Sequence, residues 1–125
     1  MSGWIVSVKG VLVAANHVAL ARNDRGEWEL PGGRLDPEDA SPEHAVIREI
    51  SEELGIQVTV SGILDSYVFE PVPGELRLIV TYRVETEGVP ELKCSSEHTE
   101  VAWIALDQLH ELDLPEGYWR SINGL

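Results

Sequence analysis

Cysteine is nearly absent from this chain: Cys94 is the only one among 125 residues. One cysteine cannot form an internal disulfide, which excludes a disulfide-stabilised fold and fits a reducing, cytoplasmic interior. No second cysteine or neighbouring motif marks Cys94 as a nucleophile, and we interpret it as incidental.

Basic residues are also scarce, with 9 Lys and Arg against 22 Asp and Glu and a formal net charge of −13. This balance argues against non-specific binding to nucleic-acid backbones, which needs clustered Lys and Arg. The same charge would repel a phosphorylated substrate unless metal ions intervened.

Long apolar runs are missing as well. Trp4, Ile5 and Val6 follow no basic segment and lead into no long apolar run, and no later stretch reaches transmembrane length. We therefore expect a soluble protein without a membrane partner. The chain lacks repeats, low-complexity tracts and linkers, so residues 1–125 are expected to form one domain with its own core.

The acidic residues that are present include a dense group in residues 48–56, Arg-Glu-Ile-Ser-Glu-Glu-Leu-Gly-Ile. Glu49, Glu52 and Glu53 have the spacing of one helix face, where they repel one another. Gly55 predicts the helix end, so these anions lie near the negative end of the helix dipole. Both effects oppose folding and predict a compensating charge from outside the chain, such as a hard divalent cation. A solvated acidic face is the alternative that this segment alone leaves open.

A turn-rich loop precedes this segment and begins with Leu-Pro-Gly-Gly at residues 30–33. Gly32 and Gly33 allow the backbone to approach another group closely. Ser41 is a good N-cap and Pro42 suits the first helical position, which predicts a helix over residues 42–54.

Together, this loop, capped helix and acidic face resemble the Nudix box, whose pattern is Gx5Ex7REUxEExGU with U an aliphatic residue. Every specified position from Arg48 to Ile56 fits. Gly33 and Arg48 lie 15 positions apart, one more than the pattern has, and Ala40 stands where the pattern places its first Glu. We expect Asp39 to replace that acid, with one residue inserted near the helix start.

The resemblance implies a Nudix-type α/β/α sandwich around a mixed β-sheet. It also implies a metal-dependent hydrolase that cleaves a phosphoanhydride bond in a nucleoside diphosphate linked to a moiety X, such as a nucleoside triphosphate, nucleotide sugar or dinucleotide. Mg²⁺ is the expected cofactor, with Mn²⁺ as a substitute. A homodimer is a further expectation, because family members often pair.

The resemblance also assigns roles to residues of the box. Glu49, Glu52 and Glu53 would hold the metal together with the backbone of Gly33, and Glu52 and Glu53 would be catalytic. Arg48 is expected to hold a carboxylate in place by a bidentate pair.

A general base in this family often comes from a loop outside the box. Glu97, six residues before Trp103, is the candidate, and Glu100 is the alternative. His98 is available to assist a proton transfer, although a lone loop histidine is more often uncommitted.

Substrate recognition is only weakly indicated by the sequence. The cations available to reach phosphates are Arg22, Arg25, Arg34 and Arg77, and the aromatic side chains available to stack on a base are Trp28, Tyr67 and Phe69. Of these, Arg34, Arg77 and Trp28 are our candidates for substrate binding. Each has a structural role as its alternative.

Apolar alternation and turn residues predict the other elements. Strands are expected over residues 4–14, 18–22, 28–30, 57–70, 75–87 and 101–106, with 71–74 closing a hairpin. Short helices are expected after Asp107 as N-cap and from Pro115 and Glu116 onward. Leu76, Leu78, Val80, Tyr82 and Val84 share one strand face. Strands before, between and after helices predict a mixed sheet held between helices.

Two other functions remain as alternatives. A diphosphate isomerase of the same fold is disfavoured by the short chain and the single loop cysteine. A noncatalytic nucleotide-binding or regulatory module is disfavoured by the intact Arg-Glu-Ile-Ser-Glu-Glu segment at residues 48–53.

Overall fold

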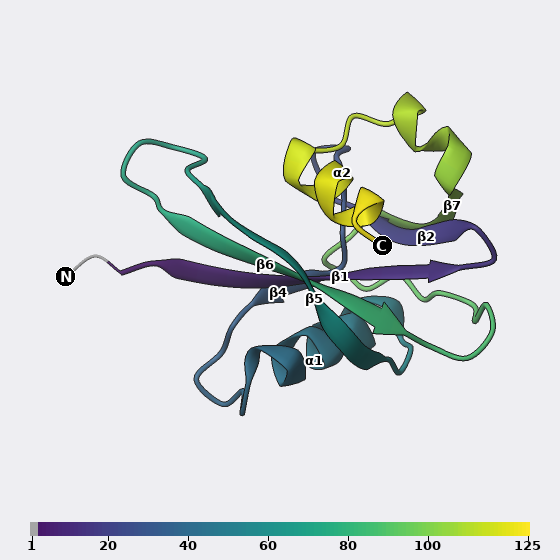
Figure 1. Ribbon diagram of the computed structural model, residues 1–125, viewed down its shortest axis with the longest axis horizontal. Helices are drawn as coiled ribbons and strands as arrows, with labels where there is room; N and C mark the ends of the chain where they lie inside the picture. Colours follow the sequence, from purple (N-terminus) through teal and green to yellow (C-terminus); the bar gives the residue numbers. More distant parts are fainter. Residues whose placement is uncertain (1–2) are drawn as a thin grey trace.

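The computed structural model describes residues 3–125, which form a seven-stranded mixed sheet with helices on both sides (Figure 1). The strands are β1 (Ile5–Ala14), β2 (His17–Arg22), β3 (Trp28–Glu29), β4 (Gly32–Arg34), β5 (Thr59–Phe69), β6 (Arg77–Glu85) and β7 (Glu100–Ala105). The helices are α1 (Pro42–Leu54), the 3-10 helix η1 (Leu106–Glu111) and α2 (Glu116–Asn123).

Strand β1 is the centre of the sheet. It runs parallel to β6 and antiparallel to β4 and β2, and it meets β4 and β2 at opposite ends. The path continues in the order β3-β2-β1-β6-β5, with β7 added to β2. The predicted mixed sheet, and with it the α/β/α fold class, is confirmed.

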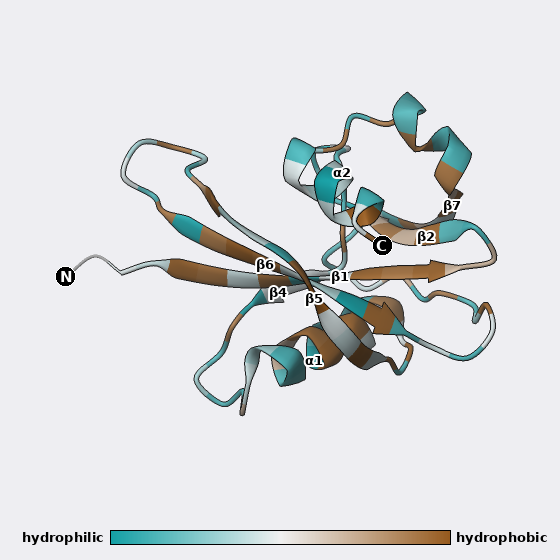
Figure 2. Cartoon of the chain, viewed as in Figure 1, coloured by the Kyte–Doolittle hydropathy of each residue, from teal (hydrophilic) through white to brown (hydrophobic). Residues whose placement is uncertain are grey.

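Two apolar cores cover the two sides of the sheet. On one side α1 packs Val46, Ile50 and Leu54 against strand residues such as Leu12 and Tyr82. On the other side the core is built by strands, η1 and α2 together, with Val11, Val18, Leu20, Leu30, Leu109, Leu114 and Ile122 as its buried residues. Figure 2 shows the apolar strands lying between these two helical layers. Within residues 3–125, no helix combines the length and apolar character that crossing a bilayer requires.

The caps predicted for α1 are confirmed. Ser41 has extended backbone angles and its hydroxyl accepts a hydrogen bond from the His44 amide at 3.1 Å. Gly55 ends the helix with a left-handed φ of 69°, and its amide donates to the Ser51 carbonyl. Local capping chemistry is therefore sufficient to define both ends of this helix.

The prediction that Gly32 and Gly33 belong to a loop is wrong, because both lie in the short strand β4. Gly32 has φ +150°, and a Cβ atom added there would collide with the carbonyl oxygen of Val8 in β1. Glycine therefore lets β4 approach β1 closely enough to pair with it.

The prediction of Asp107 as an N-cap is also wrong, since it lies inside η1. The Leu106 amide is already satisfied by the Asn16 carbonyl at 2.9 Å, so the chain passes from β7 into η1 without a side-chain cap.

The predicted apolar face of β6 is buried or half-buried along its length, and the opposite face is buried at Ile79 and Thr81. Tyr82 and Val84 pack in the core beneath α1. On the other face Thr81 is fully buried, and its hydroxyl lies 2.8 Å from that of Ser121 in α2. Helices on both sides explain why the period-two pattern revealed only one of the two buried faces.

Candidate active site

An ion pair between Arg48 and Asp39 connects α1 to the segment that links β4 to this helix. The guanidinium donates two hydrogen bonds of 2.9 Å to the two carboxylate oxygens of Asp39, as expected for a bidentate pair. Asp39, whose side chain is 1% exposed, also accepts from the Asp36 amide at 2.8 Å. The hydrogen bonds from Arg48 hold the pKa of Asp39 well below its usual range. Asp39, expected to replace the first acid of the box, thus ties the segment before α1 to the helix.

Arg48 also supplies positive charge to the glutamates of α1. Its Nη1 donates to Glu49 at 3.1 Å and to Glu52 at 3.3 Å. The expected pairing of Arg48 with a carboxylate is present, and part of the compensating charge comes from the chain itself. One cation of the chain already lies among the acids and reduces their mutual repulsion.

Glu53 does not lie on an exposed acidic face. It is 3% exposed, and its Oε2 accepts a hydrogen bond of 2.7 Å from the Gly32 amide. Burial raises the pKa of Glu53 to about 8, with Glu49 and Glu29 adding to the rise while Lys9 and the Gly32 amide oppose it. A solvated surface is thus excluded for this acid, while Glu52, with 58% of its side chain exposed, faces solvent.

Glu49 lies against Gly33. A Cβ atom added to Gly33 would come within 2.5–2.7 Å of the Glu49 carboxyl atoms, so the missing side chain leaves room for this acid. Burial raises the pKa of Glu49, and the charges of Glu52 and Glu97 raise it further while Arg48 lowers it. The structure therefore brings Glu97 into the electrostatic reach of the box.

These residues fit a hard divalent cation by their chemistry. They offer carboxylate oxygens next to a glycine backbone, which are the donors that Mg²⁺ accepts. Glu49 and Glu53 have raised pKa values and would gain from a nearby cation. In residues 3–125, however, no group of three or more His, Cys, Asp or Glu side chains converges as a ready-made metal site. Arg48 instead bridges Glu49 and Glu52.

The loop histidine has specific partners. The side chain of His98 is 4% exposed, and its Nε2 lies 2.8 Å from an oxygen of Glu29 and 3.7 Å from one of Glu53. Since both facing groups are carboxyl oxygens, we assign the proton to Nε2, which donates to Glu29. The interpretation of His98 as an uncommitted loop residue is therefore wrong, because its side chain is buried and paired with Glu29.

Two further charged residues near the acids were missed by sequence reasoning. Lys9 is 8% exposed, with its Nζ 5.9 Å from the ring centroid of Tyr118. Burial lowers the pKa of Lys9, but Tyr118, Glu29 and Glu53 together raise it above its ordinary value. Glu29 is the second missed residue. The sequence signals for the two were a lone lysine in a valine-rich strand and a glutamate between two apolar residues in Trp28-Glu29-Leu30, since charged residues are seldom buried without a partner.

The two candidate bases have different surroundings. Glu97 is exposed and its charge acts on Glu49. Glu100 begins β7 opposite Arg22 and forms an ion pair with it at 3.6 Å. Glu100 therefore has a structural partner, which favours Glu97 as the candidate base.

A cleft of about 610 Å³ opens between the β5–β6 hairpin and the start of α2. All three predicted substrate-binding residues, Trp28, Arg34 and Arg77, contribute to its wall. The other residues that line it and matter here are Lys9, Arg25, Glu29, Gly33, Tyr67, Phe69 and Tyr118. Aromatic and cationic side chains thus share one cleft with the glycine that borders Glu49.

The cleft residues also have partners in the protein. Arg77 pairs with Glu75 at 2.6 Å, and the Arg22 guanidinium lies 5.8 Å from the Trp28 ring centroid. Arg34 is exposed, and its carbonyl accepts from Arg48 at 3.5 Å. Of the three candidates, the Arg34 side chain is therefore the most exposed to a ligand.

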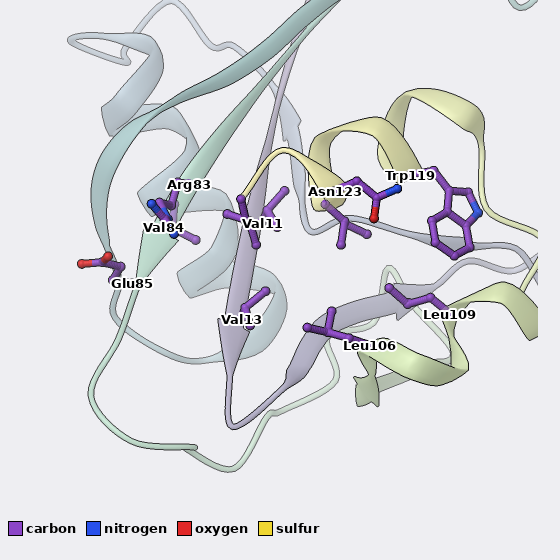
Figure 3. Close-up of a pocket in the computed structure, with 11 residues that line it drawn as sticks. Val11, Val13, Arg83, Val84, Glu85, Leu106, Leu109, Trp119 and Asn123 are labelled. Atoms are coloured by element: carbon purple, nitrogen blue, oxygen red, sulfur yellow. The ribbon is translucent and has the colours of Figure 1, made fainter.

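A second cavity, of about 460 Å³, lies between β1, β6, η1 and α2. Figure 3 shows Val11, Val13, Leu106 and Trp119 around it, with Arg83 and Glu85 at one side. None of the predicted site residues lines this cavity, so the candidate active site is the cleft that contains Gly33 and not this space.

The sandwich, with a glycine that both lines a cleft and borders the acids of α1, defines a domain of the Nudix type. The NUDIX domain family model matches residues 3–124. A MutT-like protein of Streptomyces ambofaciens is 40% identical over 108 residues, which cover 85% of this chain and 67% of the relative. CTP pyrophosphohydrolase of Escherichia coli (strain K12) is 28% identical over 104 residues, covering 83% and 73%.

Among solved structures, the crystal structure of a MutT protein from Methanosarcina mazei Go1 superposes with a TM-score of 0.80 at 27% identity. The match covers 97% of this chain and 91% of that one. The chain therefore belongs to the Nudix family, and the resemblance found in its sequence is confirmed.

Proposed function

We propose that this Nudix pyrophosphohydrolase is metal-dependent, uses Mg²⁺ or Mn²⁺, and cleaves a nucleoside diphosphate linked to a moiety X. Nucleoside triphosphates are the proposed substrate class, because a relative with 28% identity is named CTP pyrophosphohydrolase. The position of Gly33 is the observation that carries the proposal. This residue both lines the cleft and borders the Glu49 carboxyl, so the acids and the substrate site meet there.

The residues of the box would hold the metal. Glu49, Glu52 and Glu53 supply carboxylates, and Gly33 supplies backbone at the edge of the cleft. A bound divalent ion neutralises phosphate charge and lowers the pKa of a water. Arg48 would keep Glu49 and Glu52 oriented through the contacts that it already makes with them.

The other residues handle the substrate and the proton. Glu97 would accept a proton from the attacking water as its oxygen forms a bond to phosphorus. The P–O bond of the anhydride breaks, and its electron pair leaves with the departing phosphate. Arg34 and Arg77 would bind phosphate oxygens, and Trp28 would stack on the base.

The proposal is tested by incubating the full chain with Mg²⁺ and a panel of nucleoside triphosphates, nucleotide sugars and dinucleoside polyphosphates. Release of phosphate or pyrophosphate should disappear in Glu53→Gln and persist in Glu100→Gln, the matched acid outside the box. No turnover of any member, together with unchanged ligand binding in Glu53→Gln, would support the noncatalytic module instead. Isomerisation of isopentenyl diphosphate, incubated separately, without phosphate release would support the isomerase.

We also propose that residues 1–125 act as one domain in the cytoplasm and pair as a homodimer. Light scattering of the purified chain tests the pairing: a monomer mass at every concentration assayed would remove the dimer from the proposal. Cell fractionation with an antibody against the chain tests the location.

A further inference from the structure

We propose that His98 is a positioning residue that holds the buried metal ligand Glu53 and connects it to the substrate cleft through Glu29. This inference rests on the proposed function, because it takes Glu53 as a metal ligand. It adds a residue outside the box that determines how the box is oriented.

The sheet brings His98 to this place. Ala21 of β2 pairs with Glu29 of β3 on one side and with Val101 of β7 on the other. The Thr99 amide then donates to the Arg22 carbonyl at 2.9 Å, so the residues before β7 continue alongside the end of β2. His98 therefore reaches Glu29 through strand pairing, although 69 positions separate the two residues.

The contacts of His98 join two otherwise separate parts of the site. Glu53 reaches it from α1, on one side of the sheet, and Glu29 reaches it from the wall of the cleft. Lys9, which also lines the cleft, lies close enough to both acids for each to raise its pKa. Two acids and two basic side chains thus form a largely buried polar cluster between the cleft and the helix.

The Nδ1 atom of His98 indicates that this side chain does not serve fold stability alone. Its Nδ1 is buried and has no hydrogen-bond partner within residues 3–125. A buried polar atom without a partner is unfavourable, and native proteins keep few of them. The ring is thus fixed through Nε2, on the side that faces the two acids.

The test compares two amide variants of the full chain. In His98→Gln the side-chain nitrogen takes the place of Nε2 and can still donate to Glu29 while facing Glu53, whereas in His98→Asn it takes the place of Nδ1 and cannot. The probe is Mn²⁺ alone, with bound ion measured by electron paramagnetic resonance. His98→Asn should weaken Mn²⁺ binding by about 10–100-fold, and His98→Gln should restore most of it.

Kinetics provide a second readout on the best substrate of the panel. His98→Asn should lower kcat with little change in KM, because the substrate still binds in the cleft. His110→Asn, at an exposed position in η1, is the matched control and should behave as the wild type. In a Glu53→Gln background, His98→Asn should weaken Mn²⁺ binding no further, because His98 acts on the metal only through the Glu53 carboxylate.

Equal Mn²⁺ affinities in His98→Asn and wild type would overturn the inference, as would full additivity with Glu53→Gln. Absence of Mn²⁺ binding to the wild type would overturn it as well, because no metal ligand would then be positioned. If the wild type binds Mn²⁺ but hydrolyses nothing, the proposed function fails while the binding comparison still decides the role of His98.

Discussion

Glu53→Gln should abolish hydrolysis and, unexpectedly for an active-site change in a buried position, stabilise the metal-free protein at neutral pH. The wild-type carboxyl is buried, which favours its protonated form. Glutamine is also neutral and its oxygen can accept the Gly32 amide hydrogen bond. The variant therefore keeps the packing and removes the need to bury a charge.

The magnitude follows from the pKa of Glu53, which burial raises from 4.5 to about 8. Between these values the folded state binds more protons than the unfolded state, so stability is fully present below pH 4.5 and falls as the pH rises toward 8. At about 1.4 kcal/mol per unit, the wild type should lose about 3 kcal/mol relative to the variant between pH 5 and 7.5.

Urea unfolding of both proteins in a chelating buffer across this range measures the difference. Glu52→Gln is the control, since this side chain is 58% exposed, and its curve should run parallel to that of the wild type. Parallel pH profiles for wild type and Glu53→Gln would refute the reasoning. Adding Mg²⁺ should stabilise the wild type and leave Glu53→Gln nearly unchanged.

Three further predictions concern the support of the site and its base. Asp39→Asn should lower both the unfolding midpoint and kcat more than Asp36→Asn. Because the pKa of Asp39 is lowered in the folded state, the loss of stability should be largest above pH 3.8 and smaller in acid, and urea unfolding at several pH values measures it. Gly33→Ala should displace the carboxyl packed against it and cut kcat by about 10–100-fold while thermal melting changes little; equal losses of both would contradict this. Glu97→Gln should slow hydrolysis by about 10²–10⁴-fold, whereas Glu100→Gln should leave the rate nearly unchanged.

The helix α1 could be predicted with its boundaries because its signals are local. Ser41, Pro42 and Gly55 act within one turn of the residues that they cap. The replacement of the first acid of the box by Asp39 was also predictable, because Asp39 lies next to Ala40, where the pattern places its first Glu. Interactions between residues so close in sequence depend little on the tertiary structure, so they can be predicted from the sequence.

The burial of Glu53 was not predictable from helical spacing. Periodicity gives the angle of a side chain around α1, but the depth of Glu53 depends on the pairing of β4 with β1, which places the Gly32 amide above it. Nor could spacing reveal His98, whose partner Glu29 is brought near by β2. These contacts are set by the sheet, whose strand order a single sequence does not state.

The pairing of Arg48 with Asp39 bears on whether the domain stays folded without a divalent cation. The segment between β4 and α1 is held against the helix by hydrogen bonds between Arg48 and Asp39, so no metal ion is needed to hold it. The domain should therefore keep its shape in a chelator, unlike zinc fingers, which unfold without their ion. Under the proposed metal dependence, removal of Mg²⁺ should stop hydrolysis without unfolding the domain, and adding the ion back should restore activity without refolding.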